Sequence, residues 1–207
     1  MASLSLRPHN RLFVALDLPG EIRRELAERG RALATALGGR PVAEGSMHVT
    51  LGFLGRVAAE RGNALGDALE GAFPGPAPRL ELGELVAFPR RSRATVVAVE
   101  LRDPEGALAA LHARVTAAVG RVLEAPGEDR PLRPHVTLVR FRRPARVGRL
   151  EPMDEERVFD CSRCALYDSH QTPGSPPRYE ALVMASLGTP ASAREPSPPA
   201  APQDSNL

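Results

Sequence analysis

Apolar residues follow two different spacings along this chain, one typical of strands and one typical of helices. Short or alternating apolar runs predict strands at residues 12–18, 49–54, 80–88, 95–101, 136–141, 158–167 and 179–187. Apolar residues three or four positions apart predict helices at residues 21–37, about 58–72 and 104–122. Because helices and strands are mixed and neighbouring strands are joined by short turns, the pattern favours an α+β fold with antiparallel sheets over a doubly wound parallel sheet.

One four-residue sequence occurs twice. His48-Val49-Thr50-Leu51 returns as His-Val-Thr-Leu at residues 135–138, 87 positions later. Five histidines form few pairs, so a chance match of the three following residues is expected in only about one of several hundred such chains. Each copy follows a predicted helix and begins a predicted strand. The chain therefore contains two strand-helix-strand units, and we expect two lobes that face each other across a cleft.

The composition changes sharply after residue 188. Residues 189–207 are rich in Pro, Ala and Ser and have almost no large apolar side chain, so burial cannot offset the entropy of ordering them. We therefore expect residues 1–188 to form a single bilobal domain and residues 189–207 to form a disordered tail.

Strand geometry places the first and third residues of each repeat on one face, because side chains alternate along a strand. His48 and Thr50 therefore point to one side, and so do His135 and Thr137. The same alternation assigns Val49, Leu51 and Phe53 to the buried face. Each lobe is expected to present an imidazole and a hydroxyl group to the cleft.

The basic residues narrow the chemistry further. All 27 Lys and Arg residues are arginines, which excludes Schiff-base chemistry, a lysine nucleophile and a Walker-type phosphate loop. The five histidines are then the only side chains that titrate near neutrality without a large shift. One neutral imidazole that takes a proton from water and one imidazolium that protonates a departing oxygen suffice to hydrolyse a strained cyclic phosphodiester. The hydroxyls of Thr50 and Thr137 could donate hydrogen bonds to its non-bridging oxygens.

The two HxTx motifs resemble the signature of the two-histidine phosphoesterases. The flanking segments RLFVALDLP, GFLG, RPHVTLVRF and LYDSHQTPGSPPRYEAL are similar to the LigT-like branch of RNA 2′,3′-cyclic phosphodiesterases, historically described as 2′-5′ RNA ligases. The resemblance covers residues 11–187, and the Pro-rich stretch 172–177 departs from the family pattern. It implies a bilobal α+β fold with pseudo-twofold symmetry, antiparallel sheets around a central cleft, helices outside and no cofactor. It also implies hydrolysis of RNA 2′,3′-cyclic phosphate ends to 2′-phosphomonoesters, with the motif residues at His48, Thr50, His135 and Thr137.

In this interpretation His135 is the general base that activates water, and His48 is the general acid that protonates the ribose 3′-oxygen. The repeat is nearly symmetric, so the opposite division stays open. Reversible 2′-5′ RNA ligation is the alternative within the enzyme class, and a noncatalytic module that binds RNA ends is the alternative outside it. A metallohydrolase is disfavoured because no carboxylate stands at ligand spacing beside either histidine.

Three further residues are candidates for contact with the RNA. Arg133 stands two positions before His135, so alternation along a strand would place both side chains on the same face. His170 lies in the LYDSH segment. Arg140 matches the family pattern HxTLxR, but simple alternation aims it away from His135, so a role in the cleft requires a bulge or the strand end. Seven arginines and no acidic residue occur from residue 130 to residue 149, which could hold an RNA backbone or form a solvated surface.

Little else in the sequence points to a metal or a membrane. Cys161 and Cys164 form a single CxxC pair, and a tetrahedral zinc site needs two more ligands. The start of the chain lacks the apolar run of a secretory signal, and no apolar stretch approaches the ~20 residues that span a bilayer. We therefore expect a cytoplasmic, monomeric protein that binds RNA and holds no metal.

Overall fold

The computed structural model describes residues 11–124, 131–153, 157–170 and 177–190, and their strands form two antiparallel sheets. The first sheet has the order β3-β1-β8-β9 and consists of β1 (Leu12–Asp17), β3 (His48–Gly55), β8 (Arg163–His170) and β9 (Arg178–Ser186). The second sheet has the order β2-β6-β5-β4-β7 and consists of β2 (Arg40–Pro41), β4 (Arg79–Phe88), β5 (Ala94–Arg102), β6 (His135–Ala145) and β7 (Val158–Asp160).

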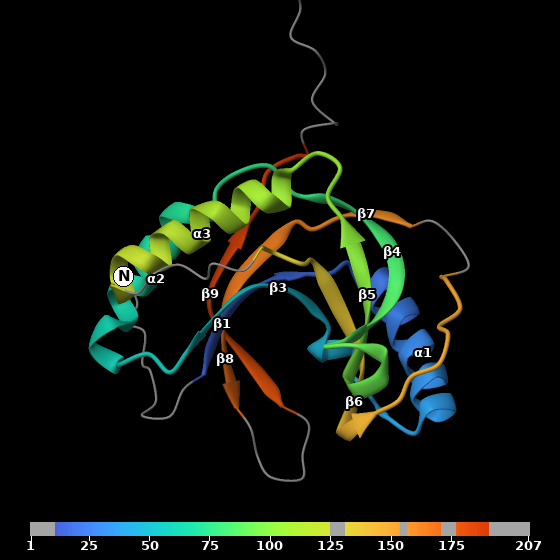
Figure 1. Ribbon diagram of the computed structural model, residues 1–207. Coiled ribbons are helices and arrows are strands. Elements are labelled where there is room, and N and C mark those ends of the chain that lie inside the picture. Colours follow the sequence, from blue (N-terminus) through green and yellow to red (C-terminus); the bar gives the residue numbers. More distant parts are fainter. Residues whose placement is uncertain (1–10, 125–130, 154–156, 171–176, 191–207) are drawn as a thin grey trace, which may run out of the picture.

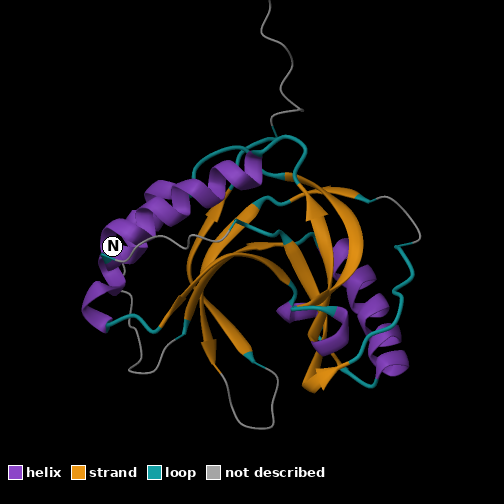
Figure 2. Cartoon of the chain, in the orientation of Figure 1, coloured by secondary structure: helices purple, strands orange, loops and turns teal. Residues whose placement is uncertain are grey.

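Within the described residues, three α-helices flank the sheets: α1 (Gly20–Leu37), α2 (Gly62–Ala72) and α3 (Ala107–Leu123). Figure 1 shows α2 and α3 beside the first sheet and α1 beside the second, and Figure 2 shows the strands curling toward each other with the helices outside. Helix α1 ends where Gly38 adopts a left-handed conformation, with φ of 68°, which glycine accepts without strain. The α+β architecture with helices outside two antiparallel sheets confirms the sequence-based prediction.

The two copies of the repeat have the same local structure. The first copy is β1-α1-β3 and the second is β5-α3-β6, and in each copy the two strands pair antiparallel. His48 lies opposite Asp17, and His135 lies opposite Glu100. Two residues further along, Thr50 and Thr137 each lie opposite an alanine. The predicted internal repeat is therefore a repeat in strand register as well as in sequence.

The helix of each copy packs on the strand of the other. Helix α1 covers β6, where Gly30 lies so close to the backbone that an added Cβ would come within 3.1 Å of the Leu138 carbonyl oxygen. Helix α3 in turn contacts β3. Buried residues of both sheets and all three helices form one continuous hydrophobic core. The two lobes are consequently interlocked, and neither has a core that is built only from its own copy of the repeat.

Some predicted elements differ from the structure, among them one strand and one helix. The predicted strand at 158–167 is two strands, because the chain leaves the second sheet after β7 and enters the first sheet at β8. Cys161 and Ser162 make the crossing, where the Cys161 N–H donates to the Pro78 carbonyl and the Ser162 carbonyl accepts from the Leu187 N–H. The helix predicted from about residue 58 begins at Gly62, after a short 3₁₀ turn at residues 59–61. Most of the predicted tail, residues 191–207, lies outside the described residues.

Candidate active site

A cavity of about 560 Å³ lies between the two sheets and contains both histidines of the repeat. His48 and Thr50 line it from β3, and His135 and Thr137 line it from β6. The alternation predicted for these four residues is therefore confirmed, because Val49 and Leu51 on the opposite face are buried in the core. The structure brings together, from the two halves of the chain, two imidazoles and two hydroxyl groups.

Both imidazole rings are held by the same backbone contact. His48 Nδ1 lies 2.9 Å from the Ser46 carbonyl oxygen, and His135 Nδ1 lies 2.7 Å from the Arg133 carbonyl oxygen. A carbonyl can only accept, so each Nδ1 carries a proton and donates it. Each ring therefore has its Nε2 left for a substrate, either as a lone pair in the neutral ring or as a second N–H in the charged one.

The surroundings of the two histidines differ. His48 packs against Phe13, with ring centroids 4.9 Å apart, and against the edge of Tyr179 at 5.3 Å. Burial lowers the pKa of His48 to about 4, and the positive charge of Arg140 acts in the same direction. The hydrogen bond to Ser46 and the charge of Asp17 oppose this shift without cancelling it. His48 is therefore neutral at pH 7 when the cavity is empty.

A bulge in each strand that carries a repeat histidine, β3 and β6, determines which residues reach the cavity beyond the repeat. Pairing of β1 with β3 skips Leu51, and pairing of β5 with β6 skips Leu138. An extra residue reverses the alternation from that point onward. Phe53 in β3 and Arg140 in β6, which are 87 positions apart like the two histidines, both turn to the cavity side and line it. The bulge that the sequence analysis required for a role of Arg140 in the cleft is therefore present. The assignment of Phe53 to the core is wrong, since its side chain is 74% exposed.

The two other predicted contact residues do not line this cavity. Arg133 forms an ion pair with Glu100 at 2.7 Å, and its guanidinium lies over the Phe88 ring, 4.8 Å from the centroid. His170 lies at the end of β8, with its Nε2 at 3.1 Å from Glu180 and 3.6 Å from Asp168. Strand alternation did not predict the orientation of the Arg133 side chain, because Arg133 lies in the segment before β6 and not in a strand.

Aromatic residues around the histidines were missed in the sequence. Phe13 and Tyr179 contact His48, and Phe88 contacts His135 with ring centroids 5.1 Å apart. The chain has only six Phe, two Tyr and no Trp, so three contacts with two histidines are a marked concentration. Phe13 and Tyr179 both stand in segments that resemble the phosphoesterase family, which is the signal that could have identified them.

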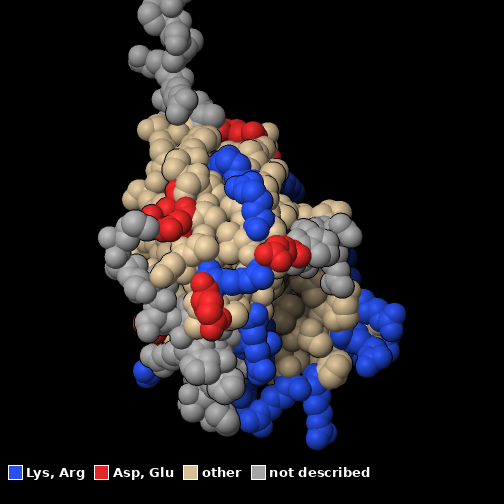
Figure 3. All heavy atoms as spheres, turned by 90° about the vertical axis from the view of Figure 1, so that its left-hand side faces the viewer, with Lys and Arg blue, Asp and Glu red and all other residues tan. Residues whose placement is uncertain are grey.

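The charge around the cavity suits an anion. Arg11 and Arg140 line it, and none of its described lining residues is Asp or Glu. The space-filling view of one side of the molecule shows a hollow with arginines below, beside and above it, and with acidic side chains level with it or above it (Figure 3). No group of three His, Cys, Asp or Glu is placed to hold a metal ion in the part of the chain that the structure describes.

The cysteines and the helices add no further site. Cys161 and Cys164 are buried free thiols, and burial raises the pKa of both. Over the described ranges, none of the helices has the length and apolar character required to cross a membrane.

Comparison with known proteins gives a consistent result at three levels. The family model of the 2′-5′ RNA ligase superfamily matches residues 18–172. An RNA 2′,3′-cyclic phosphodiesterase of Escherichia coli is 35% identical over 130 residues, which cover 63% of this chain and 71% of that protein. A protein of the same name from Thermus thermophilus is 33% identical over 149 residues, covering 65% of this chain and 70% of the relative.

Solved structures share the fold. The crystal structure of E. coli LigT complexed with 3′-AMP is 34% identical to this chain, with a TM-score of 0.72, and the match covers 86% of this chain and 98% of that one. The structure of TT0787 of Thermus thermophilus is 30% identical, with a TM-score of 0.71 and coverage of 86% and 97%. Both matches extend over nearly the whole of the related chains.

Proposed function

Because this chain belongs to the 2′-5′ RNA ligase superfamily, we propose that it is an RNA 2′,3′-cyclic phosphodiesterase that converts cyclic ends to 2′-phosphomonoesters. The observation that carries this proposal is the pair of histidines on equivalent strands of one cavity, each fixed through Nδ1 to a backbone carbonyl. Two imidazoles on opposite sides of a phosphate provide the base and the acid that the reaction needs.

In the proposed reaction a water oxygen attacks phosphorus while the bond from phosphorus to the ribose 3′-oxygen breaks. One imidazole accepts a proton from the water, and the other donates a proton to the departing 3′-oxygen. The product carries a 2′-phosphate and a free 3′-hydroxyl. Thr50 and Thr137 donate to the non-bridging oxygens, and Arg140 balances the negative charge that grows on them. No step requires a metal ion.

The environment of His48 bears on how the two roles are divided. A ring whose pKa is lowered to about 4 by burial enters the reaction neutral at pH 7, with Nε2 able to accept a proton. We therefore propose His48 as the base and His135 as the acid, the reverse of the division expected from the sequence.

A hydrolysis assay in EDTA tests the proposed function. Pure protein is incubated with an RNA that ends in 2′,3′-cyclic phosphate, and the product end is identified by mass spectrometry and by its resistance to a 3′-specific phosphatase. We expect a 2′-phosphate and no loss of rate with chelator. Absence of hydrolysis would refute the proposed activity, a 3′-phosphate product would reverse the choice of leaving oxygen, and loss of activity with EDTA would favour a metal-dependent reaction.

Phe53 and Arg140 occupy equivalent positions with different chemistry, and this predicts different kinetic effects. Stacking of a base on Phe53 contributes to binding, so Phe53→Ala is expected to raise KM about 5- to 50-fold with little change in kcat. Arg140→Ala removes charge from the transition state and is expected to lower kcat about 10²-fold. Steady-state kinetics with a dinucleotide that ends in 2′,3′-cyclic phosphate measures both effects. Met184→Ala is the control for Phe53, because Met184 is an exposed apolar residue, at 59%, that does not line the cavity.

Two alternatives make different predictions. A 2′-5′ RNA ligase would use the same histidines in reverse, and it would join an RNA with a cyclic end to an RNA with a 5′-hydroxyl in the same tube. A noncatalytic module that binds RNA ends would bind an RNA with a 2′,3′-cyclic phosphate end without hydrolysing it. We further propose that the protein acts on RNA as a cytoplasmic monomer; light scattering during gel filtration tests the monomeric state.

A further inference from the structure

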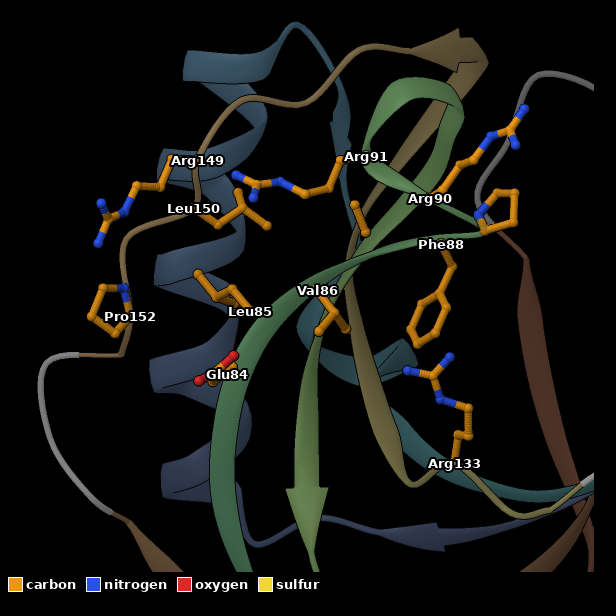
Figure 4. A pocket seen from close by; sticks show the side chains of 12 residues that line it. Glu84, Leu85, Val86, Phe88, Arg90, Arg91, Arg133, Arg149, Leu150 and Pro152 are labelled. Carbon is orange, nitrogen blue, oxygen red and sulfur yellow. The ribbon is translucent and has the colours of Figure 1, made fainter.

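A second cavity lies next to the candidate active site, on the far side of Phe88. It has a volume of about 570 Å³, similar to that of the first cavity, and Phe88 lines it. Its walls come from the end of β4, the following turn and the segment at residues 149–152 (Figure 4). We call this cavity the β4 groove. Its remaining lining residues include Glu84, Leu85, Val86, Arg90, Arg91, Arg133, Arg149, Leu150 and Pro152.

Phe88 connects the groove to the catalytic histidines. Its ring lies 5.1 Å from the ring of His135, and the guanidinium of Arg133 covers the same ring. A molecule bound between the two histidines is thus only one aromatic ring away from the β4 groove. The two cavities are therefore neighbours, since His135 of the first contacts Phe88 of the second.

The groove carries an excess of positive charge. Four arginines line it against a single carboxylate, that of Glu84. Two of these arginines are engaged: Arg91 donates from Nε to the Gly148 carbonyl at 2.9 Å, and Arg133 pairs with Glu100. Arg90 and Arg149 are exposed and are not paired with any carboxylate among the described residues. Figure 4 shows Arg149 on one side of the groove and Arg133, next to Phe88, on the other, so both sides carry an arginine.

The floor of the groove is apolar. Leu85, Val86 and Leu150 line it between the arginines, and their side chains lie between Arg149 and Phe88 in the close-up view (Figure 4). Apolar side chains flanked by a series of guanidinium groups are a combination that binds single-stranded nucleic acid, because bases pack on apolar surface while arginines contact the phosphates.

We propose that the β4 groove binds the RNA on the 5′ side of the cyclic end, with Arg90 and Arg149 contacting backbone phosphates. The inference rests on the proposed function, because a cyclic phosphate at the 3′ end leaves only the 5′ side of the RNA to extend out of the catalytic cavity. The groove would make the enzyme selective for RNA ends over free cyclic nucleotides. It also gives a place to the arginine-rich stretch around the second repeat, of which Arg133 and Arg149 are members.

A comparison of substrate lengths tests the groove. The variant Arg90→Ala/Arg149→Ala is assayed with a ten-nucleotide RNA that ends in 2′,3′-cyclic phosphate and with a 2′,3′-cyclic mononucleotide. We expect kcat/KM for the ten-nucleotide RNA to fall about tenfold, mainly through KM, and that for the mononucleotide to change less than twofold. For the longer RNA, the slope of log(kcat/KM) against log salt is expected to become shallower by ~1.4, since each lost phosphate contact removes ~0.7 for a single strand.

The matched control is Arg31→Ala/Arg121→Ala, which removes the same charge from exposed positions on α1 and α3. This control is expected to leave both substrates unaffected. Equal losses on both substrates, or no loss on the longer one, would overturn the groove while leaving the proposed activity intact. If the wild-type protein hydrolysed neither substrate, the proposed activity would be refuted. Binding of a labelled ten-nucleotide RNA would still test whether the groove binds RNA, because the affinity must then fall in the groove variant and not in the control. Competition by polyglutamate as effective as that by RNA would also contradict it, since a charge-only surface does not distinguish the two.

Discussion

Replacing either His48 or His135 by alanine is expected to lower kcat on an RNA 2′,3′-cyclic phosphate about 10²–10⁴-fold. Each ring supplies one of the two proton transfers, and both line the same cavity. The double variant should be only slightly slower than the single variants, because a residue that works as part of a pair contributes little once its partner is gone. His112→Ala is the control, since His112 lies on α3 and does not line the cavity. Unchanged kcat in both single variants would refute the two-histidine mechanism.

A substrate with sulfur in place of the bridging 3′-oxygen separates acid from base. A thiolate leaves without a proton, so the variant that lacks the acid recovers activity on this substrate while the variant that lacks the base does not. We expect His135→Ala to recover and His48→Ala to remain inactive. Recovery of His48→Ala instead would restore the division inferred from the sequence.

The pH dependence of kcat/KM follows from the same assignment. A general base must be neutral to accept a proton, so on the acid side of the profile kcat/KM falls when the pH drops through the pKa of the base in the free enzyme. Burial lowers the pKa of His48 to about 4, and we therefore expect the acid limb of kcat/KM near pH 4 rather than near the ordinary histidine value of about 6.5. If His48 were the acid, the same pKa would instead make kcat/KM fall as the pH rises above about 4.

Leu111→Ala in α3 is expected to lower the free energy of unfolding by about 2–5 kcal/mol and to weaken both lobes together. Leu111 is fully buried, and its helix belongs to the second repeat but packs on β3 of the first. Because the helices cross between lobes, neither sheet can lose its cover without disturbing the other repeat. Urea denaturation measures the stability, and hydrogen exchange measures the protection of β3 and β5 separately.

The expected result is one cooperative transition in which β3 and β5 lose protection by the same free energy. Val158→Ala is the control, because Val158 is half exposed on β7, and it should change stability by less than about 1 kcal/mol. Loss of protection in β3 with full protection retained in β5 would show that the lobes unfold independently, contrary to the interlocked core.

The sequence located the four repeat residues of the site, but it did not identify all the other residues that line the cavity. His48, Thr50, His135 and Thr137 followed from a repeat and from strict alternation, and all four line the cavity. Alternation holds only as far as the strand is regular, however, and each strand contains a bulge just after its threonine. A bulge depends on the pairing of two strands far apart in sequence, which explains why Phe53 was assigned to the wrong face.

The elements were predictable to within a few residues, except where the chain changes sheet. β7 and β8 are both extended and both contribute buried side chains, such as Phe159 and Cys164, so their hydrophobic pattern reads as one strand. The change of partner at Cys161 and Ser162 is set by tertiary hydrogen bonds to Pro78 and Leu187, and no local pattern encodes these contacts.

The paired bulges have a consequence for the direction in which a substrate binds. Two copies of one unit would by themselves form a clamp that holds a phosphate equally well in two opposite orientations. The bulges expose one equivalent position in each copy, and there the copies differ, with an aromatic ring at Phe53 and a positive charge at Arg140. A nucleotide has a flat base at one end and phosphate charge at the other, so only one of the two orientations satisfies both residues. Divergence at this duplicated position thus favours one orientation of a nucleotide in the cavity.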